Sequence, residues 1–180
     1  MSGLLALSRG IDRINTVIGR SVSWLILVAV LVSAGNAIIR KVWSISSNAW
    51  LELQWYLFGA AFLLAAAYTL LENEHIRIDI IYGARSRRTQ HWIDLIGHLL
   101  FLMPFVILMI WLMVPWLERS IANGERSMNA GGLVLWPAKA LLPFGMFLVL
   151  IQGVAELIKR IAALRGEIDE TVADYERPLQ

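Results

Sequence analysis

Four long runs of apolar residues organise the chain, and charged residues gather between them. The runs cover residues 22–39, 53–71, 95–117 and 133–155, and Lys139 is the one formal charge inside them. A helix rises 1.5 Å per residue, so about 20 apolar residues cross a hydrocarbon core of about 30 Å. The pattern therefore predicts an all-α integral membrane protein with four transmembrane helices.

The first 20 residues have a different pattern. Apolar side chains recur there at three- and four-residue steps, at Leu4, Leu7, Ile11, Ile14 and Ile18. This spacing predicts an N-terminal amphipathic helix in the headgroup layer. The alternative is that residues 1–20 are the frayed start of the first span. The residues Val32-Ser33-Ala34 resemble a signal-peptide cleavage site, but the long leader before the apolar run favours a retained span.

The placement of lysine and arginine predicts the orientation. The N-terminus, the 76–90 loop and the C-terminal tail hold three, four and four of them, against two and three in the other two connections. Cytoplasmic segments are enriched in these residues, so both termini are expected in the cytoplasm. The chain is then a single four-helix membrane domain over residues 1–160, with a polar cytoplasmic tail over residues 161–180.

Composition supports this interpretation and excludes several function classes. Hydrophobic residues make up 58% and charged residues 17% of the 180 positions, whereas a soluble domain carries about a quarter charged residues. A formal charge of +2 spread along the chain does not indicate nucleic-acid binding. The absence of cysteine excludes disulfides, thiolate metal sites and a cysteine nucleophile.

Polar residues inside the spans are few, and they lie near the span ends. Glu52 precedes the second run, where a helix N-terminus stabilises an anion. A transporter that conducts ions by itself usually has polar or broken-helix positions at the midplane, so this chain is not expected to form a transport pathway alone. Pro104 is expected to kink the third span.

Histidines raise the alternative of a haem site. His75 ends the second span and His98 lies early in the third, so the two could face each other across a hairpin. The competing interpretation places His75 and His91 among the headgroups as ordinary amphipathic side chains. A haem-binding membrane anchor for electron transfer is therefore kept as the alternative function.

A charged segment follows the second span. His75 and Asp79 are four residues apart, and Glu74 and Arg77 are three apart, so each pair would meet if the helix continues. Such pairs most often form a solvated cap that contributes a few tenths of a kcal/mol. The functional alternative is a contact with a partner subunit.

The motifs at the span ends resemble a known family. They are Asn48-Ala49-x-x-Glu52-Leu53-Gln54-Trp55, Tyr68-Thr69-Leu70, His75-Ile76-Arg77-Ile78-Asp79, Gly131-Gly132-x-x-x-Trp136-Pro137-x-Lys139 and Gln152-Gly153-x-x-Glu156. Over about residues 10–160 the chain is similar to the small membrane subunit, of the DctQ type, of tripartite ATP-independent periplasmic (TRAP) transporters. The later motifs resemble the branch labelled for mannitol, chloroaromatic or keto-acid uptake.

The resemblance implies a subunit of a bacterial inner-membrane transporter and not an enzyme. In that family a large membrane subunit of the DctM type holds the sodium and substrate sites, and a periplasmic binding protein delivers an organic acid. The small subunit braces the large one among the membrane lipids, and no cofactor is expected in this chain. By this resemblance, five positions become structural or subunit-interface candidates: Glu52, Trp55, His75, Arg77 and Asp79.

The loop over residues 118–132 faces the periplasm by the charge count. Five of its residues are candidates for docking the binding protein: Asn123, Gly124, Glu125, Arg126 and Asn129. Deleting residues 123–129 should then weaken solute delivery and leave assembly intact. A stand-alone membrane protein with a structural role remains a further alternative, which the polar motifs at the span ends disfavour.

Overall fold

The protein is a set of long helices, as the apolar runs predict. The structure, a computed structural model, describes residues 2–45, 47–75 and 82–168. The helices are α1 (Ser2–Trp43), α2 (Asn48–Leu71), α4 (Arg87–Gly97), the π-helix η1 (His98–Leu102), α5 (Met103–Ala122) and α6 (Trp136–Leu164). The rods α1, α2, α4–η1–α5 and α6 are each long and apolar enough to cross a membrane.

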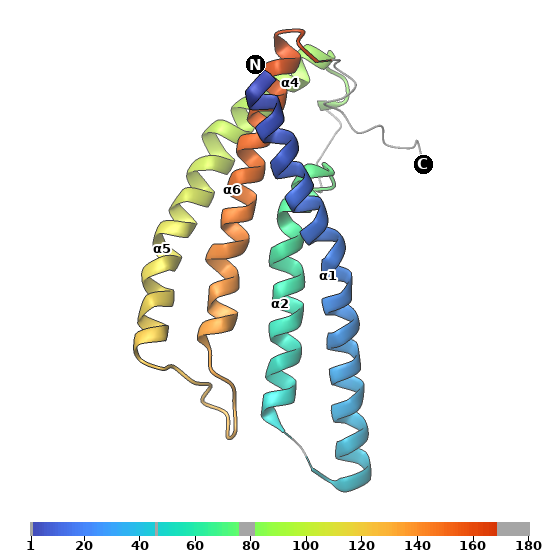
Figure 1. Cartoon of the computed structure of the whole chain (residues 1–180), viewed down its shortest axis with the longest axis vertical. Helices are drawn as coiled ribbons and strands as arrows, with labels where there is room; N and C mark the ends of the chain where they lie inside the picture. Colours follow the sequence, from blue (N-terminus) through green and yellow to red (C-terminus); the bar gives the residue numbers. More distant parts are fainter. Residues whose placement is uncertain (1, 46, 76–81, 169–180) are drawn as a thin grey trace.

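The helices form a layer in the order α5, α6, α2, α1 toward the end where the two connecting loops lie, and toward the other end α1 crosses to contact α6 (Figure 1). One end of the layer holds the N-terminus, α4 and the end of α6; we name it the N-terminal end. The opposite end holds the α1–α2 and α5–α6 connections; we name it the loop end. In the most apolar stretch of each rod, 44% of α6 is buried but only 11% of α4–η1–α5. Helix α6 is therefore the centre of the layer, and α5 is its outer edge.

Helix α1 joins the predicted amphipathic segment to the first span without a break. Its buried residues follow a strict seven-residue step, at Ser8, Asn15, Val22, Ala29 and Asn36. A seven-residue repeat keeps one face of a helix against its neighbour. The amphipathic segment is helical as expected: Leu4, Leu7 and Ile14 are exposed, Ile11 and Ile18 are half-buried, and Ser8 and Asn15 pack inward. The inward-facing side of α1 therefore lies against polar partners on α6.

The third rod contains a wide turn where a kink was expected. Between α4 and α5, residues His98–Leu102 form a π-helix, and the Met103 amide donates to the His98 carbonyl. Pro104 follows at once; it has no N–H, and its ring clashes with the carbonyl four residues earlier. A π turn inside an α-helix relieves this conflict.

Helix α6 differs at both ends from the predicted fourth span. It begins at Trp136 with Pro137 in its first turn, three residues after the predicted start. Proline suits a first turn because that turn needs no amide donor. The three preceding residues are outside the helix, where the Leu133 amide donates to Glu52. At the other end α6 continues to Leu164, so its last turn includes the start of the predicted tail.

Helices α2 and α6 approach closely at a glycine. A Cβ at Gly145 would lie 2.9 Å from the Leu63 carbonyl oxygen and 3.1 Å from its Cβ. Small residues allow this kind of backbone contact between membrane helices. The contact lies beside the core of the layer, which is formed by Ala67, Leu70, Val106, Leu148 and Val149.

Gly145→Ala is expected to destabilise the layer. The added methyl group meets backbone that cannot rotate away, and overpacking of this kind costs about 1–3 kcal/mol. Unfolding of the purified protein in mixed detergent micelles would measure the loss. Gly59→Ala is the matched control because a Cβ there meets nothing within 4 Å. Equal stability of the two variants would contradict the close approach.

Candidate functional site

At the loop end, Glu52 holds the α5–α6 connection. Its Oε1 accepts from the Ser127 hydroxyl and, at 2.8 Å, from Asn129 Nδ2, and its Oε2 accepts from the Leu133 amide at 2.7 Å. Two more bonds tie α2 to the same connection, from Asn48 Nδ2 to the Ala130 carbonyl and from the Tyr56 hydroxyl to the Val134 carbonyl. The α5–α6 connection is therefore an ordered loop that hydrogen bonds hold to α2.

The loop also closes on itself and on α6. Arg126 and Val134 form an isolated antiparallel bridge. Glu125 pairs with Lys139 Nζ, which also lies 4.3 Å from the centre of the Trp116 ring. The hydrogen bond from Lys139 lowers the pKa of the Glu125 carboxyl below its ordinary 4.5. The ion pair thus contributes above pH 4.5 and is lost as the pH falls through the lowered pKa.

At the N-terminal end, a first polar cluster joins α1 to α6. Gln152 is fully buried; its Nε2 donates to Asp12 and Glu156, and its Oε1 accepts from Asn15 Nδ2 at 2.7 Å. Lys159 Nζ pairs with Asp12 at 3.2 Å and with Glu156 at 2.5 Å. We name these five residues the α1–α6 cluster. In it the carboxylates of Asp12 and Glu156 share the Lys159 ammonium group, which offsets part of the cost of burying them.

A second polar cluster joins α4 to α6 through Arg160, the residue that follows Lys159 on α6. Arg160 Nη2 lies 3.3 Å from Asp94 Oδ2, and both side chains are at least nine-tenths buried. The Tyr82 hydroxyl donates to the same carboxylate at 2.8 Å. Arg160 Nη1 lies 3.1 Å from His91 Nδ1; because a guanidinium only donates, His91 carries its proton on Nε2. We name Tyr82, His91, Asp94 and Arg160 the α4–α6 cluster.

The structure places the predicted site residues in several regions. Glu52 binds the loop, Trp55 is 75% exposed on α2, and His75 is exposed just beyond the end of α2. Arg77 and Asp79 lie outside the described residues, and so do the pairs proposed for them with Glu74 and His75. Of the loop candidates, Asn123, Gly124, Arg126 and Asn129 are exposed, and Glu125 is half-buried.

Sequence reasoning missed both polar clusters at the N-terminal end. His91, expected among the headgroups, is fully buried against Arg160. The available signal was spacing: Gln152, Glu156 and Arg160 recur every fourth residue on a mostly apolar helix. A repeated polar position on a membrane helix needs a partner, because an unpaired polar group in hydrocarbon is costly.

Together these features define a class of protein. Four membrane-crossing rods are fixed to one another by polar clusters at the N-terminal end and by the ordered α5–α6 connection at the loop end. Among the described residues, no group of three or more histidine, cysteine or carboxylate side chains is placed to hold a metal ion. The fold and its polar sites are those of a multi-pass helical membrane protein with large apolar faces.

Comparison with known families gives the assignment. Residues 28–163 match the family described as tripartite ATP-independent periplasmic transporters, DctQ component. The chain belongs to this family, and it is the small membrane subunit of a TRAP transporter. Membership implies association with other components of such a transporter. Searches of curated proteins and of solved structures gave no match.

Proposed function

We propose that this chain is the non-catalytic brace of a sodium-coupled TRAP transporter that imports an organic acid, in the branch for mannitol, chloroaromatic or keto-acid uptake. It sits in the bacterial inner membrane with both termini in the cytoplasm, so the N-terminal end of the layer is cytoplasmic and the loop end periplasmic. A large subunit of the DctM type holds the sodium and substrate sites. A periplasmic protein delivers the solute.

The exposed apolar faces of the layer are the observation that carries this proposal. The rod ending in α5 keeps most of its apolar stretch exposed. Helix α2 adds an outward stripe at three- and four-residue steps, Leu51, Trp55, Phe58 and Phe62. Such a stripe suits packing against another membrane helix. These faces support a role beside a larger subunit.

The polar clusters support a bracing role. Each is closed within the chain, since the carboxylates of Asp12, Asp94 and Glu156 pair with cations on α6. Groups paired in this way fix the angle between rods and are not placed to carry ions. In the proposal, this chain gives the large subunit a stiff neighbour, and chemistry and solute binding occur elsewhere.

Affinity purification of the tagged chain from its native membrane tests the proposal. We expect mass spectrometry to find a large multi-span permease in the eluate, and deletion of this chain to abolish uptake of the solute. A Soret band in the purified protein would favour the haem-binding anchor, which the family assignment does not support. Recovery of the chain alone, with uptake unaffected by its deletion, would contradict the proposal.

A further inference from the structure

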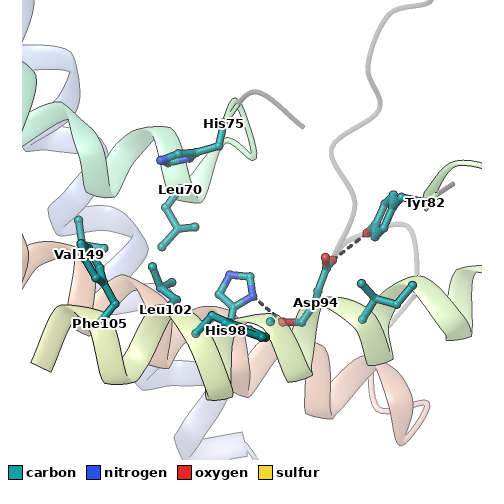
Figure 2. Close-up of a pocket in the computed structure, with 11 residues that line it drawn as sticks. Leu70, His75, Tyr82, Asp94, His98, Leu102, Phe105 and Val149 are labelled. Carbon is teal, nitrogen blue, oxygen red and sulfur yellow. Dashed lines mark hydrogen bonds between the residues drawn. The ribbon is translucent and has the colours of Figure 1, made fainter. Parts of the chain in front are cut away.

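A cavity of about 740 Å³ opens between the end of α2 and the wide turn of the third rod. It is lined by Leu70, His75, Tyr82, Ile93, Asp94, Gly97, His98, Phe101, Leu102, Phe105 and Val149. Figure 2 shows His75 beside the end of α2 and His98 on the opposite wall. Its volume lies within the range of about 300–1,000 Å³ that is typical of small-ligand sites.

The cavity has one polar end and one apolar end. Tyr82, Asp94 and His98 line the part nearest the N-terminal end of the layer, Leu102, Phe105 and Val149 line the part toward the middle of the membrane, and His75 lies on the opposite wall above Leu70 (Figure 2). Most of the lining is apolar. A ligand that matches this gradient has a polar head at the membrane surface and an apolar chain below it.

His98 gives the polar end a defined chemistry. Its side chain is more than nine-tenths buried, and its Nδ1 lies 2.6 Å from the Asp94 carbonyl oxygen. A carbonyl only accepts, so Nδ1 carries a proton and donates. In the neutral ring Nε2 then holds a lone pair, and the described residues supply no hydrogen bond to it. His98 lines the cavity, so this acceptor can take a hydrogen bond from a ligand there.

His75, just beyond the end of α2, adds a second polar contact. It has no hydrogen bond to any other described residue, and its side chain is exposed at the cavity. An imidazole N–H can donate to a phosphate oxygen. The two histidines together thus offer one acceptor for an N–H or O–H donor and one donor for an anion.

We propose that this cavity binds one phospholipid whose head carries a primary ammonium group, with the ammonium on His98 Nε2, the phosphate beside His75 and an acyl chain along Phe105 and Val149. The N–H donors are essential, since a trimethylated head has none to offer to Nε2. The inference requires only that the rods span a bilayer; it does not depend on the transport role proposed above.

Headgroup competition tests the proposal on the full chain with its co-purifying subunits. The protein is incorporated into nanodiscs of phosphatidylethanolamine and phosphatidylcholine with identical acyl chains, and retained lipids are counted by native mass spectrometry. We expect a preference of about tenfold for the ethanolamine lipid. His98→Phe keeps the ring but removes the acceptor and should abolish the preference, whereas His98→Gln, which restores an acceptor near Nε2, should retain part of it.

A photo-crosslink keeps the proposal falsifiable if the His98 variants fail to fold. Benzoylphenylalanine at position 101, in the cavity wall, should crosslink the ethanolamine lipid in excess of its share of the nanodisc. The matched control is position 111 on α5, which is exposed but lies outside this cavity and should crosslink the two lipids in proportion to their shares. Equal retention of the two headgroups, a crosslink from position 101 to another protein subunit, or a Soret band would each overturn the proposal.

Discussion

Replacing Arg160 with methionine is expected to be the most destabilising single change in the chain. Asp94 would keep its buried carboxylate but lose its cation, and His91 would lose the donor to its Nδ1. Breaking a buried ion pair by removing one partner costs about 3–5 kcal/mol. Unfolding in mixed micelles, followed by circular dichroism, would measure the loss. Arg165→Met is the matched control, because Arg165 is an exposed arginine just beyond the end of α6.

A double variant distinguishes the cost of an unpaired buried charge from the cost of lost packing. Arg160→Met together with Asp94→Leu removes both charges of this ion pair, so it should recover part of the stability that Arg160→Met loses. The Tyr82 hydroxyl loses the Asp94 carboxylate as an acceptor in that variant, which sets a limit on the recovery. If Arg160→Met were as stable as Arg165→Met, the α4–α6 cluster would not be what fixes α4 to α6.

The second large effect is expected at Glu52. Glu52→Ala removes the acceptor for the Leu133 amide and for the side chains of Ser127 and Asn129 at once. Amide hydrogen exchange over the loop should then accelerate on the order of tenfold or more, because local opening no longer breaks these bonds. The rods should remain folded, since the loop lies at the end of the layer and outside its core.

The same variant tests the docking proposal for the loop. If the loop receives the periplasmic binding protein, Glu52→Ala should lower uptake while the large subunit still co-purifies. Glu118→Ala is the control, an exposed carboxylate at the same end of α5. Wild-type uptake by a variant whose loop exchanges rapidly would show that an ordered loop is not needed for delivery. This design is sharper than deleting residues 123–129, which also removes the Glu125 partner of Lys139.

The rods were predictable from the sequence because a bilayer imposes one rule on every span. A run long enough to cross hydrocarbon must form a helix to satisfy its own backbone, and no tertiary information is needed. The residue at which each helix begins was harder to predict. Leu133 and Val134 are as apolar as the span that follows, but a carboxylate 81 residues earlier binds the Leu133 amide and keeps it in the loop.

The polar partners were not predictable because they are distant in sequence. Asp12 and Gln152 meet across 140 positions, and nothing near either residue indicates the other. The rotation of the N-terminal part of α1 has the same origin: Asn15 donates to Gln152 on α6, so this polar side chain faces inward while Leu4 and Leu7 are exposed. In a membrane the exposed apolar face carries no penalty, so pairing decides the rotation of the helix.

The π-helical turn at His98–Leu102 also determines which faces of α4 and α5 are directed at α6. Buried positions advance by four residues from Gln90 to Asp94 to His98, then by five to Met103, and Val106 follows. The polar face of α4 and the apolar face of α5 are thus both directed at α6. Losing one residue here would rotate α5 by about 100° and point lipid-facing aromatic side chains at the core. This segment should therefore tolerate a change of residue type more readily than a change of length.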